Sequence, residues 1–406
     1  MIMRVNIMQS ARLRSSLQRY LGYGPMAALA VILFGVSANI TSGLKPLILD
    51  SHVRFINLSI SGAGDVISIE FLFGAIACYL VSLKIATWNR FYMAFGAIVL
   101  MLCGNLGAAY STDVFGIYAS RLIAGIGHGA GYGVLAGAIA GSHSPERLGS
   151  AYTVVAMSTV MLASFAAPTT QSIVGSSGLY ILILLAVCLG AITLPFFPKR
   201  PSSEHVDLIF KNDVSVEASR FAVASVLVGT LFYFMAVGGV WPYFGQLMQA
   251  NDVAYDVSSK AIGYATAASI AGALCAAGLG VRYGRILPIA GALLLQICAL
   301  SAPLIFPSVG MVYIVSSICF MFGWLFFFPY LLGLLSILDP YGKICSRGYT
   351  IALFCFGFGP FLAARLVSMS GLYLVLWMGL FFLLFAFVIF VATLRRMADV
   401  SRDVLP

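Results

Sequence analysis

The sequence predicts an all-α integral membrane protein with twelve transmembrane helices in two pseudo-symmetric halves of six. The first of three observations is composition: 61% of the 406 residues are hydrophobic and 9% are charged, against about 25% charged in an average soluble protein. The second is a series of apolar runs, each long enough to cross a hydrocarbon core of about 30 Å, which takes about 20 helical residues. The third is an internal repeat. The mean hydropathy of +1.00 excludes a soluble enzyme, a disordered chain and a secreted disulfide scaffold.

Six apolar runs follow a basic N-terminal segment, residues 1–24, which we expect to be cytoplasmic. The first run is too long for the apolar part of a signal peptide, and no small-residue cleavage site follows it. The runs do not alternate over about ten residues as transmembrane β-strands do, so we interpret them as helices. The helices predicted in the first half cover residues 25–49, 62–85, 91–110, 115–141, 151–174 and 178–197.

The most polar stretch of the chain, residues 198–220, predicts a cytoplasmic linker between the halves. Six further runs of membrane length follow it, and the chain ends in a segment, residues 395–406, which we expect to be cytoplasmic. The helices predicted in the second half cover residues 221–248, 260–281, 286–306, 309–338, 349–368 and 371–394.

The two halves repeat the same landmarks at a nearly constant spacing. Arg90 follows the second predicted helix and Arg285 follows the eighth, 195 residues later. Pro168 in the fifth helix and Pro360 in the eleventh are 192 residues apart. Two parallel six-helix halves are a known transporter design with a substrate site near the membrane midplane. We therefore expect two six-helix bundles, residues 25–197 and 221–394.

Basic residues collect on one side of this topology. Of the 23 Lys and Arg residues, 18 fall in segments that are cytoplasmic if the N-terminus is inside, whereas the external loops hold only Arg54 and, at an edge, Lys260. This bias predicts a multi-pass membrane protein with both termini in the cytoplasm. It also accounts for the net charge of +9 without a nucleic-acid partner.

The fourth predicted helix carries the strongest local motif. The stretch from Arg121 to Gly129, with Gly125 and Gly127 between them, resembles the R-x-x-x-G-x-G-x-G pattern of the major facilitator superfamily. The loop that follows, residues 145–151, is similar to the family's P-x-x-R-G-x-A segment. The resemblance covers nearly the whole chain and is to bacterial members of the family. It implies a protein of the bacterial inner membrane with two halves that rock around a central substrate site.

The loop after the eighth helix also resembles a family motif, G-x-L-x-D-R-x-G-R, through Arg282, Gly284 and Arg285. Val281 stands where the family has Asp. The resemblance implies a role in cytoplasmic gating, which the missing Asp weakens. Pro168 lies in a sequence similar to the family's antiport motif, with Ala in place of Gly. Its partner in the second half is the pair Gly359 and Pro360, and helix packing is the alternative role for all three.

The glycines of the fourth helix also have a physical interpretation. Gly125 and Gly129 are four residues apart, and Gly127 lies on a different face. Small residues at this spacing let two helices approach closely. We therefore expect the fourth helix to pack tightly on two faces.

Five charged residues lie inside the predicted helices, all in the outer half of the bilayer: Lys45, Asp65, Glu70, Arg121 and Arg365. An ionisable residue in a membrane span is costly and is by default a functional candidate. We expect Glu70 to pair with Arg121. In one interpretation Glu70 carries a coupling proton, and in another the three bases bind an anionic substrate. The alternative is structural ion pairing, with Lys45 extended toward the outer surface.

The helix face that carries Arg121 and Gly125 also carries His128 and Tyr132. If Arg121 faces a central cavity, His128 does too. The titration range of His128 suits proton traffic, although a neutral histidine bonded to a neighbouring helix is an equal alternative.

The second half has aromatic residues in place of acids. Four of them, on the seventh and tenth predicted helices, carry polar groups and are candidates for the cavity wall, with interfacial anchoring or packing as the alternative. They are Trp241, Tyr243, Trp324 and Tyr330.

Together these features predict a secondary transporter that moves a small organic molecule by alternating access and couples to protons. The alternatives are an uncoupled facilitator of a small organic anion and, from other classes, a transporter-like sensor or a membrane enzyme. The longest polar segment, about 23 residues, is short for a sensor's output domain. No catalytic motif supports an enzyme. We expect a monomer with no metal, cofactor or catalytic residues.

Overall fold

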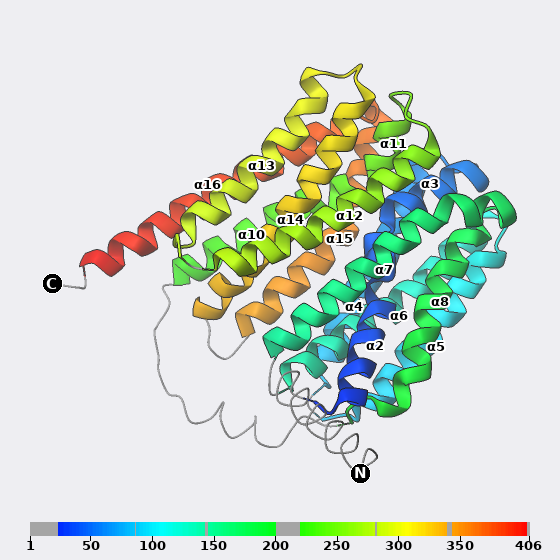
Figure 1. Ribbon diagram of the computed structural model, residues 1–406, viewed down its shortest axis with the longest axis horizontal. Coiled ribbons are helices and arrows are strands. Elements are labelled where there is room, and N and C mark those ends of the chain that lie inside the picture. Colours follow the sequence, from blue (N-terminus) through cyan, green and yellow to red (C-terminus); the bar gives the residue numbers. More distant parts are fainter. Residues whose placement is uncertain are drawn as a thin grey trace, which may run out of the picture.

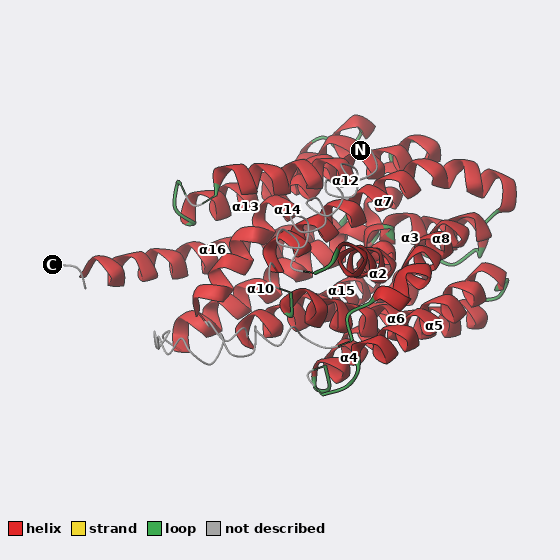
Figure 2. Ribbon diagram, turned by 60° about the horizontal axis from the view of Figure 1, so that its bottom comes forward, coloured by secondary structure: helices red, strands yellow, loops and turns green. Residues whose placement is uncertain are grey.

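The computed structural model describes residues 23–85, 87–142, 145–199, 220–280, 282–338 and 343–403. These residues form helices and short loops without strands (Figure 2). Twelve helices are long and apolar enough to cross a membrane, which confirms the predicted class. A helix satisfies its backbone hydrogen bonds internally, which lipid requires of any lone spanning segment. Large apolar side chains such as Leu162, Ile192 and Leu274 are more than half exposed, as lipid-facing residues are.

The described residues of the first half form seven α-helices and one 3-10 turn. These elements are α2 (Pro25–Gly43), α3 (Lys45–Phe55), α4 (Ile60–Ser82), α5 (Arg90–Tyr110), α6 (Val114–Ala140), α7 (Pro145–Val174), α8 (Ser177–Thr193) and η1 (Leu194–Phe196). The second half contains α10 (Arg220–Val240), η2 (Trp241–Tyr243), α11 (Phe244–Gln249), α12 (Tyr255–Leu279), α13 (Ile286–Ile305), α14 (Gly310–Leu338), α15 (Lys343–Ser370) and α16 (Leu374–Asp403).

Two predicted helices are interrupted in the structure. The first, expected over 25–49, breaks at Leu44 into α2 and α3, and the seventh, expected over 221–248, becomes α10, a 3-10 turn and α11. Pro46 and Pro242 stand at the first turns of the new elements. A proline lacks the backbone N–H that would continue the helix before it, which accounts for both breaks. Three other helices are longer than predicted: α7 begins at Pro145, α15 begins at Lys343 and α16 ends at Asp403.

The helices pack as two bundles that contact each other. In the first bundle α4 and α5 pack on α6, and α2 packs on α8; in the second, α12 packs on α14 and α10 on α15 and α16. Contacts between the bundles join α4 to α15, α7 to α12, and α3 to η2 and α11. The two bundles lie together at the end that holds α3 and α11 and diverge toward the opposite end (Figure 1). We call the first end the α3 face. The residue limits of the two halves stay a prediction.

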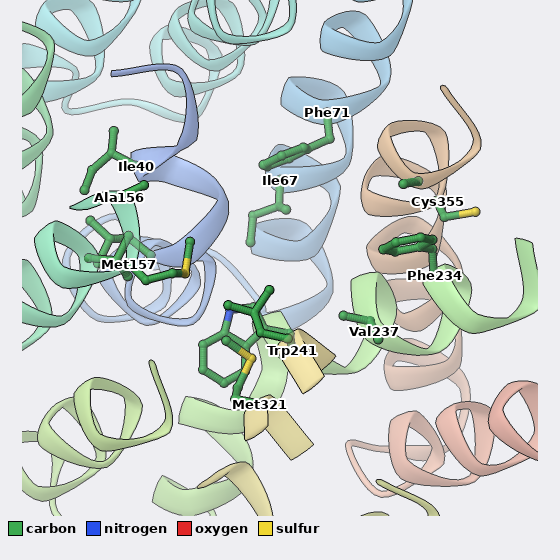
Figure 3. Close-up of a cluster of buried hydrophobic side chains, with 14 of the residues drawn as sticks. Ile40, Ile67, Phe71, Ala156, Met157, Phe234, Val237, Trp241, Met321 and Cys355 are labelled. Atoms are coloured by element: carbon green, nitrogen blue, oxygen red, sulfur yellow. The ribbon is translucent and has the colours of Figure 1, made fainter. Parts of the chain in front are cut away.

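Buried apolar side chains of both bundles form the contact surface. Ile67 and Phe71 of α4 belong to the same buried cluster as Phe234 of α10 and Trp241 of η2 (Figure 3). The Phe71 and Phe356 rings meet edge to face across the bundles, with centroids 6.3 Å apart.

Glycines bring α4, α5 and α6 close together. A Cβ on Gly125 would overlap the carbonyl group of Glu70, and a Cβ on Gly129 would overlap the backbone of Gly74. On the other face of α6, a Cβ on Gly127 would stand 2.6 Å from the Met101 nitrogen. The fourth predicted helix therefore packs tightly on two faces, against α4 and against α5.

Replacing Gly129 with alanine is expected to destabilise the protein by about 1–3 kcal/mol, because the new methyl group meets backbone atoms that cannot rotate away. Thermal unfolding in detergent, followed by tryptophan fluorescence, measures the change. Gly96→Ala on α5 is the control, since a Cβ there meets nothing within 4 Å. Equal melting temperatures for the two variants would contradict this account of the α4–α6 contact.

Candidate functional site

A buried ion pair links α4 and α6. Nη1 of Arg121 donates to Oε2 of Glu70 over 3.2 Å, and the two side chains are 0% and 2% exposed. The expected pair is therefore present. Its position follows from packing, because Gly125, one turn beyond Arg121, lies directly against the Glu70 backbone. The motif's glycine brings the acid and the base into contact.

Neutral polar residues complete a network around Arg121. Its Nη2 donates to Oδ1 of Asn105 on α5 over 2.6 Å, and Nδ2 of Asn105 lies 3.3 Å from Nε2 of His128. The Arg121 guanidinium lies 5.3 Å from the ring centroid of Tyr180 on α8. The Tyr180 hydroxyl is hydrogen-bonded to Nε2 of His52 on α3 over 2.6 Å. Asn105, Tyr180 and His52 are absent from the sequence-based site.

The network borders a small cavity between the bundles. Its lining comes from α4, from α6 and, across the bundle contact, from Leu353 of α15. The cavity of about 10 Å³ is the size of one water molecule. Oε1 of Glu70 has no hydrogen-bond partner among the described residues. His128, 3% exposed, and Tyr132, which bonds Asn39 of α2, also line the cavity. Three residues of the expected face of α6 therefore line this cavity, whereas Arg121 is fully buried and does not.

Lys45 does not extend to the surface, so that alternative was wrong. Its side chain is 1% exposed. The Lys45 ammonium lies 3.7 Å from the ring centroid of Phe71 and 4.1 Å from that of Phe356, and it donates to the Phe356 carbonyl over 3.4 Å. Two aromatic rings, one from each bundle, hold the charge by cation–π contact. No carboxylate of the described residues lies within ion-pair distance of it.

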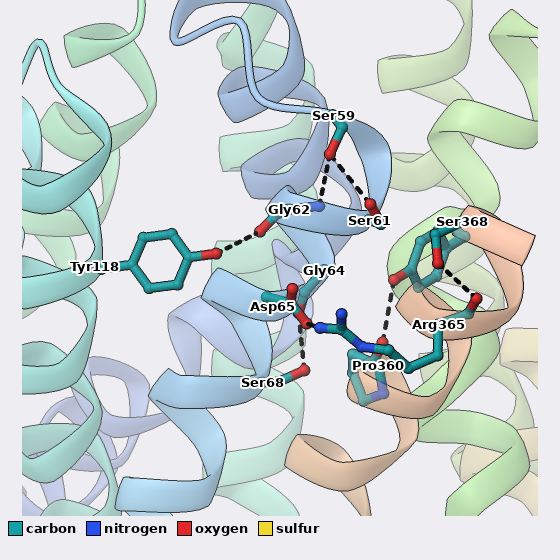
Figure 4. A network of polar contacts seen from close by, with 11 residues as sticks. Ser59, Ser61, Gly62, Gly64, Asp65, Ser68, Tyr118, Pro360, Arg365 and Ser368 are labelled. Carbon is teal, nitrogen blue, oxygen red and sulfur yellow. Dashed lines mark hydrogen bonds and ion pairs between the residues drawn. The ribbon is translucent and has the colours of Figure 1, made fainter.

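Asp65 and Arg365 form a separate ion pair across the bundles, from α4 to α15. Figure 4 shows this pair near the bond from the Tyr118 hydroxyl to the Gly62 carbonyl. The Arg365 side chain is 47% exposed and that of Asp65 is 23% exposed. The five charged residues therefore divide into a buried pair, a partly exposed pair and an isolated lysine.

The aromatic candidates have different positions. The Trp241 indole donates to the Gly43 carbonyl over 3.3 Å and so joins the bundles. Tyr243 donates to the Pro360 carbonyl, and its hydroxyl also lies against Gly64 of α4, so it stands where the bundles meet. Tyr330 donates to the Gly280 carbonyl inside the second bundle. The cavity-wall role of these two tyrosines stays a prediction. The Trp324 ring lies edge to face with Phe356, and its Nε1 has no partner among the described residues.

The remaining motif residues lie in packing or loop positions. Pro168 and Pro360 are internal to α7 and α15, and a Cβ on Gly359 would stand 2.7 Å from the Gly239 nitrogen of α10. Gly284 has φ of +69°, which favours glycine. It lies with Arg282 and Arg285 in the loop from α12 to α13, at the end of the molecule opposite the α3 face. Among the described residues, no three His, Cys, Asp or Glu side chains form a metal-binding group.

Comparisons with known proteins agree with this architecture. The sequence profile of the Major Facilitator Superfamily matches residues 27–343, and no curated protein sequence matches the chain. A partially occluded inward-open structure of the xylose transporter XylE from E. coli is similar with a TM-score of 0.67 at 14% identity, covering 89% of this chain and 96% of that one.

Two other solved structures show the same fold. A D-xylose–proton symporter has a TM-score of 0.68 at 17% identity, covering 89% of this chain and 95% of that one. A variant of the nucleoside transporter NupG has a TM-score of 0.64 at 13% identity, covering 91% of this chain and 99% of that one. With a family match over most of its length and this fold, the chain is a transporter that belongs to the Major Facilitator Superfamily.

Proposed function

We propose that this chain is a proton-coupled secondary transporter that moves a small organic molecule by alternating access. The observation that carries the proposal is the buried pair of Glu70 and Arg121, whose Glu70 Oε1 lacks a partner among the described residues and borders a cavity lined by both bundles. A carboxylate in that position is able to exchange its proton with whichever side of the membrane the space between the bundles opens to.

Protonation of Glu70 would turn the pair into a two-state element. The neutral acid no longer holds Arg121 by charge, but Asn105 still accepts a hydrogen bond from the guanidinium. Arg121 therefore keeps a polar partner in both states, which lowers the cost of releasing Glu70 in a low-dielectric interior. The freed guanidinium is available to a substrate oxygen.

The positive-inside bias supports an orientation with the α3 face outside and both termini in the cytoplasm of a bacterium. In that orientation, contacts between the bundles lie on the outer side, so the protein faces inward. We propose a monomer, because each chain contains both bundles, and halves with limits at 25–197 and 221–394.

Transport in proteoliposomes with an internal pH-sensitive dye tests the proposal. Sugars, nucleosides, amino acids and organic acids form the substrate panel; sugars and nucleosides are included because solved relatives of this fold are named for them. We expect one class to drive proton movement in the wild type and not in Glu70→Gln. Asp256→Asn is the matched control, because its exposed carboxylate lies outside the buried pair.

Proton movement that survives in Glu70→Gln would eliminate Glu70 as the carrier and direct attention to His128. Substrate movement without protons in the wild type would contradict coupling altogether.

A second candidate, an uncoupled facilitator of a small organic anion, is favoured by Lys45. Counting formal charges, the buried residues Lys45, Arg121 and Glu70 sum to +1 near the bundle contact. A buried ammonium without a carboxylate is costly. A carboxylate or phosphate group on the substrate would neutralise it when the bundles separate.

Replacing Lys45 with methionine tests that candidate. If an anionic substrate binds the ammonium, the variant is expected to raise its KM about 10–100-fold, since a hydrogen bond to a charged group contributes about 1.5–3 kcal/mol. A neutral substrate would keep its KM. Counterflow of labelled substrate in proteoliposomes measures both, and an unchanged KM for anions would exclude this candidate.

A further inference from the structure

We propose that Asp50, Gln246 and Gln249 form a latch that closes the outer entrance of the transporter, and that a proton bound to Asp50 stabilises the closed form. The inference rests on the proposed alternating access and on the outer position of the α3 face. It does not depend on Glu70 as the coupling residue.

Asp50 joins the two bundles directly. Nε2 of Gln246 donates to Oδ1 of Asp50 over 2.6 Å, and Nε2 of Gln249 donates to Oδ2 over 2.8 Å. Asp50 is 0% exposed. The two glutamines are three residues apart on α11, one helical turn, so both amides reach one carboxylate. Opening the α3 face separates α3 from α11 and breaks both bonds.

The local backbone favours this contact. Pro46 starts α3 and Pro242 lies just before α11, so each bundle contributes a short helix set off from its first long one. A Cβ on Gly245 would overlap the Asp50 carboxylate. Only glycine at this position lets the carboxylate lie against the α11 backbone.

No cation among the described residues is bonded to Asp50. Arg54, one turn further along α3, lies over the Tyr255 ring of α12 at 3.7 Å and forms no ion pair with Asp50. The Tyr255 hydroxyl, the titratable group of α12 near Asp50, donates to Oε1 of Gln171 on α7. His52, also on α3, bonds Tyr180 of α8 instead, and α11 contains no titratable residue.

Burial without a bonded cation disfavours the carboxylate and raises the pKa of Asp50 to about 7, although the two amides and Arg54 oppose the shift. When the α3 face opens, water reaches Asp50 and its pKa returns toward the usual ~3.9. The closed form thus binds the proton more tightly. Closure is favoured as the pH falls from about 7 toward ~4, with the ratio of closed to open molecules rising about tenfold per pH unit, and it is independent of pH above about 7.

Distances across the outer end test this latch on the full chain in lipid nanodiscs. Spin labels at Thr112→Cys and Ser308→Cys report on exposed outer loops of the two bundles, in a transport-competent background without the 8 native cysteines. Pulsed electron–electron double resonance measures the distance between the two labels from pH 8 to pH 5 and so gives the open and closed populations. We expect the open population of the otherwise unchanged protein to shrink as the pH falls below 7.

Three variants test the role of the proton and the role of the hydrogen bonds separately. Asp50→Asn mimics the protonated acid and should stay closed at every pH. Gln249→Met removes one of the two bonds and should enlarge the open population, without changing the carboxylate itself. Asp256→Asn, an exposed acid at the same end, should keep the original pH profile.

An Asp50→Asn protein that retains the original pH profile would overturn the role of the proton. A Gln249→Met protein with unchanged populations would overturn the latch. Because the readout is a distance, a failure of proton coupling at Glu70 would leave these results unaffected.

Discussion

Replacing Arg121 with glutamine is expected to lower the stability of the protein by about 3–5 kcal/mol and to abolish transport. The change removes the only charged partner that the structure gives Glu70 among the described residues and leaves its carboxylate buried and uncompensated. Breaking a buried ion pair from one side has that cost, because the remaining charge cannot reach water. Glu70 avoids this cost only by taking up a proton. The proposed cycle requires Glu70 to release that proton again, so a permanently protonated Glu70 stops transport.

The double variant Glu70→Gln/Arg121→Gln separates stability from function. Both charges are gone, so no uncompensated ion remains, and we expect most of the lost stability to return. Transport coupled to protons should stay absent, because the titrating group is missing. Recovered stability together with recovered coupling would contradict the assignment of Glu70.

Thermal unfolding in detergent and uptake in proteoliposomes measure the two effects separately. Arg365→Gln provides the matched control, since its pair with Asp65 also joins two helices but is partly exposed. An exposed pair contributes about 0–1 kcal/mol, so that variant should unfold close to the wild type. If Arg121→Gln were as stable as Arg365→Gln, burial of the Glu70–Arg121 pair would not contribute to the stability of the protein.

The ion pair was predictable because charge is rare in this chain. Glu70 and Arg121 each interrupt an apolar run, and that interruption alone makes them functional candidates. Asn105, Tyr180 and His52 complete the same network without such a signal, because neutral polar side chains are tolerated in membrane helices. Asn105, the one amide in an otherwise apolar run, offered the best clue.

The contacts of the proposed outer latch were missed for a different reason. Pro46 and Pro242 are 196 residues apart, close to the spacing of the other repeated landmarks, and each marks the end of a long helix. The residues around both prolines are apolar, so a hydropathy profile predicts one continuous helix at each of these positions. Asp50 falls just beyond the predicted first span, where a carboxylate is expected to meet water, and nothing in the sequence indicates that α11 covers it.

Lys45 was singled out for its charge, but its surroundings were predicted wrongly. A lysine near a helix end has enough length to reach the surface, and nothing nearby in sequence indicates otherwise. Phe356, one of the two rings that hold its ammonium, is 311 residues away. Contacts between halves depend on the conformation of the transporter, and local sequence patterns carry no information about that.

Two glycines show the same difference between contacts within one bundle and contacts across the two bundles. Gly129 packs within the first bundle, whereas Gly357 of α15 packs against α4 across the bundles. A Cβ on Gly357 would stand 2.7 Å from the Leu72 nitrogen and 3.0 Å from the Phe71 carbonyl carbon. In the proposed cycle, both contacts are lost when the α3 face opens.

Replacing Gly357 with valine should therefore stop transport without unfolding the protein. Overpacking costs about 1–3 kcal/mol, and here the whole cost falls on the closed conformation. The closed-to-open ratio should drop about tenfold for each 1.4 kcal/mol. We expect transport to fall at least about tenfold, with melting temperatures close to those of Gly278→Val, a control position where a Cβ meets nothing within 4 Å.

The distance between labels at positions 112 and 308 distinguishes this mechanism from a general defect. In Gly357→Val the open population should dominate at every pH, because the obstacle is steric and lies deeper in the bundle contact than Asp50. Gly129→Ala should show the reverse pattern, with a lower melting temperature and an unchanged distance distribution, since its obstacle lies inside one rigid bundle. If Gly357→Val instead unfolded like Gly129→Ala, the α4–α15 contact would belong to the folded core and not to a surface that opens during transport.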